Sequence, residues 1–180
     1  AVLVLHALTG DSHAAGPSEL GHPHDGWWSE VIGPGKAIDT DRFYVVCPNV
    51  FGGCQGTTGP SSINSRTGKP FGATFPIVTV RDQAVIESAL ADSLGITEWS
   101  ALIGGSMGGQ RALEWLVSFP DRIKRAVLIA CGATATAEEI ALSSIQIRAI
   151  EADPRWRGGD YYDAAPGDGP HSGLSIARGM

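Results

Sequence analysis

The sequence predicts an α/β fold built on a doubly wound, mostly parallel sheet. Short apolar runs alternate along the chain with segments whose apolar residues recur at helical spacing. The runs with the length and composition of buried strands lie at residues 2–5, 43–47, 99–103 and 126–130. They lack the polar alternation of a strand with one wet face, which favours a parallel sheet with both faces covered.

The composition is that of a globular domain, or of part of one, in a chain of 180 residues with 43% hydrophobic residues. The net charge of −6 and the lack of a long basic run exclude the electrostatic footprint of a nucleic-acid-binding protein. No apolar stretch reaches the ~18 residues of a membrane span. Cys47, Cys54 and Cys131 are odd in number and lack zinc-binding spacing, so we expect free thiols in a cytoplasmic protein.

The first predicted strand, residues 2–5, runs into a short loop that contains Leu8. In hydrolases built on such sheets, the loop after the corresponding strand supplies a backbone N–H to the oxyanion hole. Leu8 is the residue we expect to supply it, and an ordinary turn is the alternative. Asp11-Ser12-His13 follows, but adjacent residues rarely converge on one point, so we interpret this triplet as loop.

The histidines near the N-terminus raise the question of a metal site. They are His6, His13, His22 and His24. Their spacings match neither H-x₃₋₅-H nor H-E-x-x-H, so histidines of surface loops are favoured and no metal is expected.

Two long loops flank the second strand. Residues 14–42 carry the pair Trp27-Trp28, which favours a packed aromatic contact over a ligand platform. Residues 48–62 are rich in glycine, which allows backbone to approach a ligand, and a mobile surface loop is the alternative. A helix is predicted from Asp82 to a stop at Gly95. We expect its buried face to hold Val85, Ile86, Ala89, Leu90 and Leu94.

The strand at 99–103 leads into Gly104-Gly105-Ser106-Met107-Gly108, which fits the pattern G-x-S-x-G. A helix is predicted directly behind it, with Ala112, Leu113, Leu116 and Val117 on one face. Strand, tight turn, serine and helix together are the context of a nucleophile elbow. We therefore predict Ser106 as the nucleophile and the Met107 N–H as an oxyanion donor; a packing or phosphate-binding turn is the alternative.

After the strand at 126–130, Thr136 and Glu139 form a capping-box pattern that opens a helix ended by Pro154. Residues 155–171 are expected to be loop, and 172–178 the start of a further helix. The apolar residues of the first of these helices are Ile140, Ile145, Ile147 and Ile150.

A serine nucleophile of this fold needs an acid and a base that follow it in the order Ser…Asp/Glu…His. His171 is the only histidine after Ser106, and no strand pattern precedes it. We therefore assign neither it nor any later aspartate, and expect an excerpt that ends before the last two catalytic strands. Such a stretch should be nearly inactive by itself and should leave a sheet edge uncovered.

Several motifs in the same order resemble the homoserine O-acetyltransferases, which are α/β-hydrolase-fold enzymes of methionine biosynthesis. They are residues 6–13, 26–28, 49–54, 58–62, 104–109, 111–115 and 150–154. The resemblance implies ping-pong transfer of an acetyl group from acetyl-CoA, as co-substrate, to L-homoserine through Ser106, without a cofactor. It also implies that Leu8 and Met107 stabilise the oxyanion, that Arg178 binds the homoserine carboxylate, and that the protein is a homodimer.

On this resemblance, residues 1–133 are the N-terminal part of the hydrolase core, and residues 134–180 begin a helical lid. A serine esterase or other hydrolase with the same elbow is the first alternative, because the fold does not determine the acceptor. A relative that uses succinyl-CoA or another hydroxyl acceptor is the second. A non-catalytic binding module that kept the fold is the third.

Overall fold

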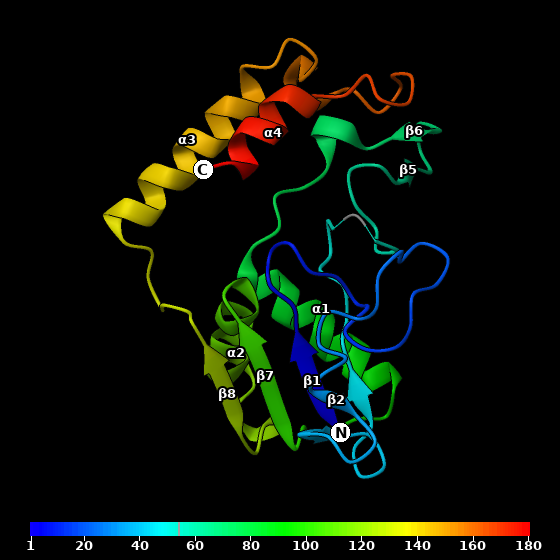
Figure 1. The fold of residues 1–180 in the computed structure, drawn as a ribbon, viewed down its shortest axis with the longest axis vertical. Coiled ribbons are helices and arrows are strands. Elements are labelled where there is room, and N and C mark those ends of the chain that lie inside the picture. Colours follow the sequence, from blue (N-terminus) through cyan, green and yellow to red (C-terminus); the bar gives the residue numbers. More distant parts are fainter. Residues whose placement is uncertain (54) are drawn as a thin grey trace. The chain divides into compact units, whose positions relative to one another are not determined.

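The computed structural model describes residues 1–53 and 55–180, so Cys54 lies outside the described residues. Contacts within the chain group the residues into two compact units (Figure 1). Residues 1–57 and 78–133 form the first, which we call the sheet unit. Residues 58–77 and 134–180 form the second, which we call the helical unit.

The sheet unit contains the predicted parallel sheet, with strand order β4-β1-β7-β8. Its strands are β1 (Val2–Leu5), β4 (Val45–Val46), β7 (Ala101–Gly105) and β8 (Ala126–Ile129). All three pairings are parallel, which confirms the predicted sheet. The strand predicted at 43–47 is reduced to two residues. The strand predicted at 99–103 begins two residues later, because Trp99 forms only an isolated bridge with Ile123.

The two faces of this sheet are covered by different kinds of structure. Helices α1 (Val80–Ser93) and α2 (Met107–Ser118) pack with Leu3 and Leu5 on one face, around an edge-to-face pair formed by Trp99 and Trp115. Val2 and Val4 pack on the other face against the segment that precedes β4. That segment carries the short strands β2 (Ile32–Gly33) and β3 (Ile38–Asp39). A 3-10 turn, η2 (Pro120–Arg122), follows α2.

Helix α1 differs from the prediction in its start and in its buried face. Thr79 is the N-cap and forms a capping box with Asp82, so the helix begins two residues before the predicted start. The predicted aliphatic face is wrong, because Val85 and Ile86 are exposed. Small and polar residues face the core instead: Ala84, Glu87, Ser88 and Ala91. Small side chains let α2 approach closely, and Glu87 there reaches partners on α2. The predicted stop is confirmed, since Gly95 has φ +71° just past the helix.

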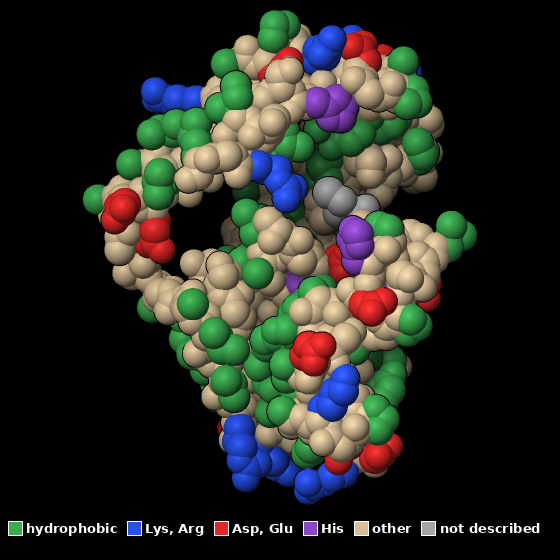
Figure 2. Space-filling model, viewed as in Figure 1, with side chains coloured by type: hydrophobic (Ala, Val, Ile, Leu, Met, Phe, Trp, Pro, Cys, Tyr) green, Lys and Arg blue, Asp and Glu red, His purple; other side chains and the backbone are tan. Residues whose placement is uncertain are grey.

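The buried face of α2 also differs from the prediction. Ala112 is buried as expected, but Val117 is 73% exposed and the largest buried side chains are Arg111 and Trp115. Strand β8 was expected to be buried, yet Val127, Leu128 and Ile129 reach solvent. β8 is one of the two edge strands of this sheet, and apolar side chains show on the surface in this region (Figure 2). The sheet edge is thus uncovered, as the sequence led us to expect.

In the helical unit, α3 (Ala137–Glu151) packs against α4 (His171–Arg178) (Figure 1). The capping box of Thr136 and Glu139 is confirmed. The isoleucines at 140, 145 and 147 are exposed. The rest of this unit comprises the hairpin β5 (Ile63–Asn64) and β6 (Lys69–Pro70) and the 3-10 turns η1 (Gly72–Thr74) and η3 (Arg157–Gly159). That residues 134–180 begin a lid stays a prediction.

Among the helices of residues 1–53 and 55–180, none combines the length and apolar character needed to cross a lipid bilayer.

Candidate active site

Ser106 lies at the turn between β7 and α2, in a backbone conformation that non-glycine residues rarely adopt. Its φ and ψ angles are 53° and −123°. Its backbone N–H donates to the carbonyl oxygen of Ile129 at 2.9 Å, which holds the turn against β8. The side chain is exposed and makes no capping hydrogen bond to α2. A serine in a strained turn, whose hydroxyl has no hydrogen-bond partner in the part of the chain that the structure describes, has the geometry of a nucleophile elbow.

Glycines make this turn possible, because backbone or side-chain atoms occupy the space where a Cβ would stand. A Cβ on Gly104 would lie 2.2 Å from the carbonyl oxygen of Gly108. A Cβ on Gly108 would lie 1.9 Å from the carbonyl oxygen of Leu5, and one on Gly109 would lie 2.5 Å from Sγ of Cys131. The first turn of α2 therefore packs directly on the end of β1.

The two predicted oxyanion donors follow the ends of neighbouring strands. Leu5 of β1 pairs with Gly104 of β7, so the loop that carries Leu8 leaves the sheet beside the turn that carries Met107. Within residues 1–53 and 55–180, neither the Leu8 N–H nor the Met107 N–H donates to a protein acceptor. The role of both N–H groups in an oxyanion hole stays a prediction.

His6, at the end of β1, is buried and serves the structure of these loops. Its Nδ1–H donates to the carbonyl oxygen of Ala7 at 2.7 Å, and its Nε2 accepts from the N–H of Val50 at 3.2 Å. Burial lowers the pKa of His6, which keeps the ring neutral in this arrangement. His6 thus ties the loop of Leu8 to the segment after β4.

A buried ion pair beneath the elbow was missed by the sequence reasoning. Arg111 of α2 donates from Nε to Oε1 of Glu87 at 2.8 Å, and Nε1 of Trp115 donates to Oε2 of Glu87 at 2.6 Å. Arg111 also donates, at 3.5 Å each, to the carbonyl oxygens of His6 and Pro48. One guanidinium therefore joins both helices to the ends of β1 and β4.

Burial raises the pKa of the Glu87 carboxyl, and the Arg111 guanidinium and the Trp115 N–H offset part of that rise because they favour the anion. The signal in the sequence that could have predicted this pair was one charged residue on each helix, Glu87 and Arg111, on the faces that turn toward the core. The regular spacing of aliphatic residues on α1 obscured that signal.

The cysteines that the structure describes, Cys47 and Cys131, are free thiols, as predicted. Burial raises the pKa of Cys47 to about 12, so its sulfur stays protonated near neutral pH. The Cys47 thiol donates to the carbonyl oxygen of Asp11 at 3.7 Å. Cys47 is therefore no rival to Ser106 as a nucleophile.

Arg178, the predicted substrate-binding residue, is the last residue of α4 in the helical unit. Its side chain is exposed and forms no ion pair with the described residues. The guanidinium is thus free to bind a carboxylate, and that role stays a prediction.

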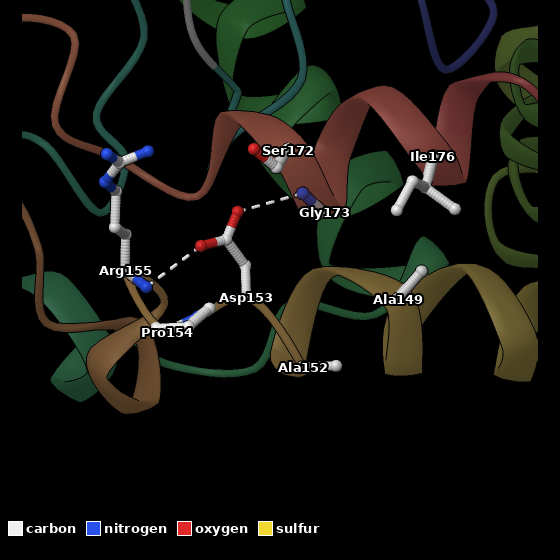
Figure 3. A pocket seen from close by; sticks show the side chains of 8 residues that line it. All are labelled: Ala149, Ala152, Asp153, Pro154, Arg155, Ser172, Gly173 and Ile176. Carbon is white, nitrogen blue, oxygen red and sulfur yellow. Dashed lines mark hydrogen bonds between the residues drawn. The ribbon is translucent and has the colours of Figure 1, made fainter.

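Asp153 has a structural role, which agrees with leaving it unassigned as a catalytic acid. It accepts hydrogen bonds at 2.9 Å from the backbone N–H groups of Gly173 and Arg155, and these bonds lower its pKa (Figure 3). It lines a cavity of about 440 Å³ between α3 and α4. Its carboxylate fixes the entry to α4 in place of a side-chain N-cap.

The curated relatives are named homoserine O-acetyltransferase. The chain is 59% identical over its whole length to the protein of Clavibacter michiganensis subsp. michiganensis, and covers 46% of it. It is 57% identical to the protein of Leifsonia xyli subsp. xyli, again over the whole chain and over 44% of that relative. These relatives confirm the resemblance drawn from the motifs. The chain spans about half the length of the curated relatives it matches.

Solved structures share this fold. The chain resembles the crystal structure of esterase E22 with a TM-score of 0.89 and 38% identity, over 98% of this chain and 49% of that one. It resembles the crystal structure of homoserine O-acetyltransferase from Bacillus anthracis with a TM-score of 0.87 and 33% identity. That match covers 98% of this chain and 48% of the other. A family model described as the alpha/beta hydrolase fold matches residues 1–174. Strand order, elbow geometry and this match together show that the chain belongs to the alpha/beta hydrolase fold family.

Proposed function

We propose that this chain carries the nucleophile and oxyanion donors of an acyltransferase that moves an acetyl group from acetyl-CoA to the hydroxyl of L-homoserine. The observation that carries the proposal is the strained, exposed Ser106 at the β7–α2 turn, with an uncommitted N–H on the next residue. Relatives named homoserine O-acetyltransferase support the choice of substrates.

In this proposal the Ser106 hydroxyl attacks the thioester carbonyl of acetyl-CoA. The N–H groups of Leu8 and Met107 donate to the oxyanion of the tetrahedral intermediate. The intermediate collapses to acetyl-Ser106 and expels the CoA thiolate, which takes up the proton. The homoserine hydroxyl then attacks the acetyl-serine carbonyl, the bond between that carbonyl and Oγ of Ser106 breaks, and the hydroxyl proton passes to Oγ as O-acetylhomoserine leaves.

Serine needs a general base for this step. Among the described residues no histidine hydrogen-bonds to the Ser106 side chain. We therefore expect the 180 residues alone to be nearly inactive. A burst of acetylation by the isolated chain would contradict this expectation.

Arg178 is assigned to the homoserine carboxylate, because a guanidinium matches a carboxylate through two parallel hydrogen bonds. In this role, Arg178→Ala should weaken homoserine use and spare acetylation of the enzyme. Equal loss of both half-reactions would contradict the assignment. The same resemblance supports a homodimer, which light scattering on the full-length protein would test.

A serine esterase is the second candidate, and the likeness to esterase E22 favours it. Transferase and esterase share the first half-reaction and differ in whether an alcohol or water accepts the acetyl group. The fold does not decide between them.

The test uses the full-length protein and follows release of the CoA thiol from acetyl-CoA, with and without L-homoserine. Release that depends on homoserine, with formation of O-acetylhomoserine, supports the transferase. Release at the same rate without homoserine supports the esterase. Succinyl-CoA in parallel tests the donor, and faster use of succinyl-CoA would overturn the acetyl assignment.

A further inference from the structure

A second cluster of reactive side chains lies in the loop after β1, within the sheet unit. His13, Glu19 and His22 each offer a ligand atom within 4.8 Å of the other two. Nδ1 of His13 lies 3.6 Å from Oε1 of Glu19. Asp11 adds a further carboxylate, with Oδ2 at 3.4 Å from Nδ1 of His22. The spacing of these residues disfavoured a metal site, but the folded loop brings them together.

Backbone hydrogen bonds build this cluster. Glu19 and His22 exchange two N–H···O bonds of 2.9 Å across a tight turn, which places their side chains on one side of it. Gly21 allows the turn with φ +91°. Asp11 holds the N–H of His13 at 2.8 Å through Oδ1, and Nε1 of Trp27 donates to the Asp11 carbonyl at 3.0 Å. The ligand positions are therefore set before any ion binds.

The two imidazole rings of this cluster lie close together. The rings of His13 and His22 stack with centroids 4.6 Å apart and planes inclined by 17°. Both histidines line a hollow of about 210 Å³ with Asp11, His24 and Trp27.

We propose that His13, Glu19 and His22 bind one divalent transition-metal ion of the zinc class, with Asp11 beside His22 to orient its ring. Imidazole nitrogen and carboxylate oxygen bind Zn²⁺ at about 2.0–2.2 Å, which sets tetrahedral ligand atoms roughly 3.4 Å apart. The 3.6 Å between Nδ1 of His13 and Oε1 of Glu19 is close to that value, and the ligand atoms of the three residues lie within 4.8 Å of one another. Three protein ligands leave the fourth tetrahedral position to water, and the ion would join the turn at residues 19–22 to His13.

The test measures Zn²⁺ binding to the full-length protein after chelator treatment, by calorimetry and by the visible absorption of Co²⁺ in its place. We expect His13→Ala and His22→Ala each to weaken Zn²⁺ binding at least tenfold and to abolish the tetrahedral Co²⁺ band. Glu19→Gln should weaken binding as well. Glu19 is exposed, so we expect the Glu19→Gln variant to fold. This variant therefore tests the proposal even if a histidine variant does not fold.

His24→Ala is the matched control, because His24 lines the same hollow and lies outside the ligand cluster. It should bind Zn²⁺ as tightly as the unsubstituted protein. The proposal is overturned by a protein that takes up no Zn²⁺, by Zn²⁺ uptake that all the cluster variants retain, or by equal weakening in His24→Ala.

Discussion

Helices α2 and α3 begin in opposite ways. At the start of α3, Thr136 accepts from the Glu139 N–H and Glu139 accepts from the Thr136 N–H, so side chains satisfy the first turn. At the start of α2, Ser106 has positive φ and offers its side chain to none of the helix N–H groups. Serine is among the best N-cap residues, so this departure is informative.

The difference shows that no side-chain cap stabilises the start of α2, whereas a capping box stabilises the start of α3. Ser106 is exposed, and the buried Arg111–Glu87 pair secures the helix from within instead. Departures from local preference concentrate at functional sites, where packing elsewhere compensates for them.

The largest expected effect comes from Ser106→Ala in the full-length protein. Loss of the nucleophile should lower kcat by at least about 10⁴-fold, because the remaining groups only bind and polarise the thioester. The melting temperature should change little, since no capping bond is lost. Release of CoA thiol and mass spectrometry of the acetylated protein measure the effect, with Ser93→Ala as an active control. Acetylation of another residue at the normal rate would refute the role of Ser106.

Arg111→Met tests whether the buried pair replaces the missing cap. Removal of one partner leaves Glu87 buried and uncompensated, which should cost about 3–5 kcal/mol of unfolding free energy. The double variant Arg111→Met with Glu87→Met should recover much of that loss, because neither charge remains buried. Urea unfolding of both single variants and of the double variant gives the interaction free energy between Arg111 and Glu87. Purely additive losses would mean that the pair does not act as a unit.

Thr136→Ala tests the other helix start. Loss of the N-cap should destabilise α3 by about 1 kcal/mol. Thr136→Ser keeps the hydroxyl and should retain most of the stability. Hydrogen exchange of the amides in the first turn of α3 measures both. The comparison between α2 and α3 fails if Ser106→Ala proves as destabilising as Thr136→Ala.

The smallest effect concerns pH at the α3 cap. Hydrogen bonds from the backbone N–H and hydroxyl of Thr136 hold the pKa of Glu139 below its ordinary value. A depressed folded-state pKa gives stability that is present above the unfolded pKa of about 4.3 and is lost as the pH falls through the folded pKa. Exchange protection in the first turn of α3 should therefore drop on acidification, and less so in Glu139→Gln. Glu138→Gln, which alters no side-chain hydrogen bond of the described residues, should behave like the unsubstituted protein.

The sequence predicted the features that depend on local pattern. The apolar runs at 2–5 and 126–130 identified two strands to within one residue, and G-x-S-x-G between a strand and a helix located the turn at Ser106. These predictions succeeded because each feature is specified by a few consecutive residues. The exposure of β8 reflects its position at the sheet edge, which its composition does not report.

The features that the sequence did not reveal depend on contacts between distant residues. Glu87 and Arg111 become partners only when α1 and α2 pack, and that packing turns the small face of α1 inward rather than its aliphatic face. His13 and His22 come together only through the tight turn at Gly21. The spacing of these residues along the chain does not reveal that Glu87 meets Arg111 or that His13 meets His22.

The glycines around Ser106 limit how this site can evolve. An oversized side chain in a core can be accommodated when a neighbour becomes smaller. At Gly104 and Gly108 the neighbour is backbone, which no substitution can shrink. A second mutation therefore cannot compensate for a larger residue at these positions of the elbow. A saturation library at Gly108 selected for activity should return glycine alone.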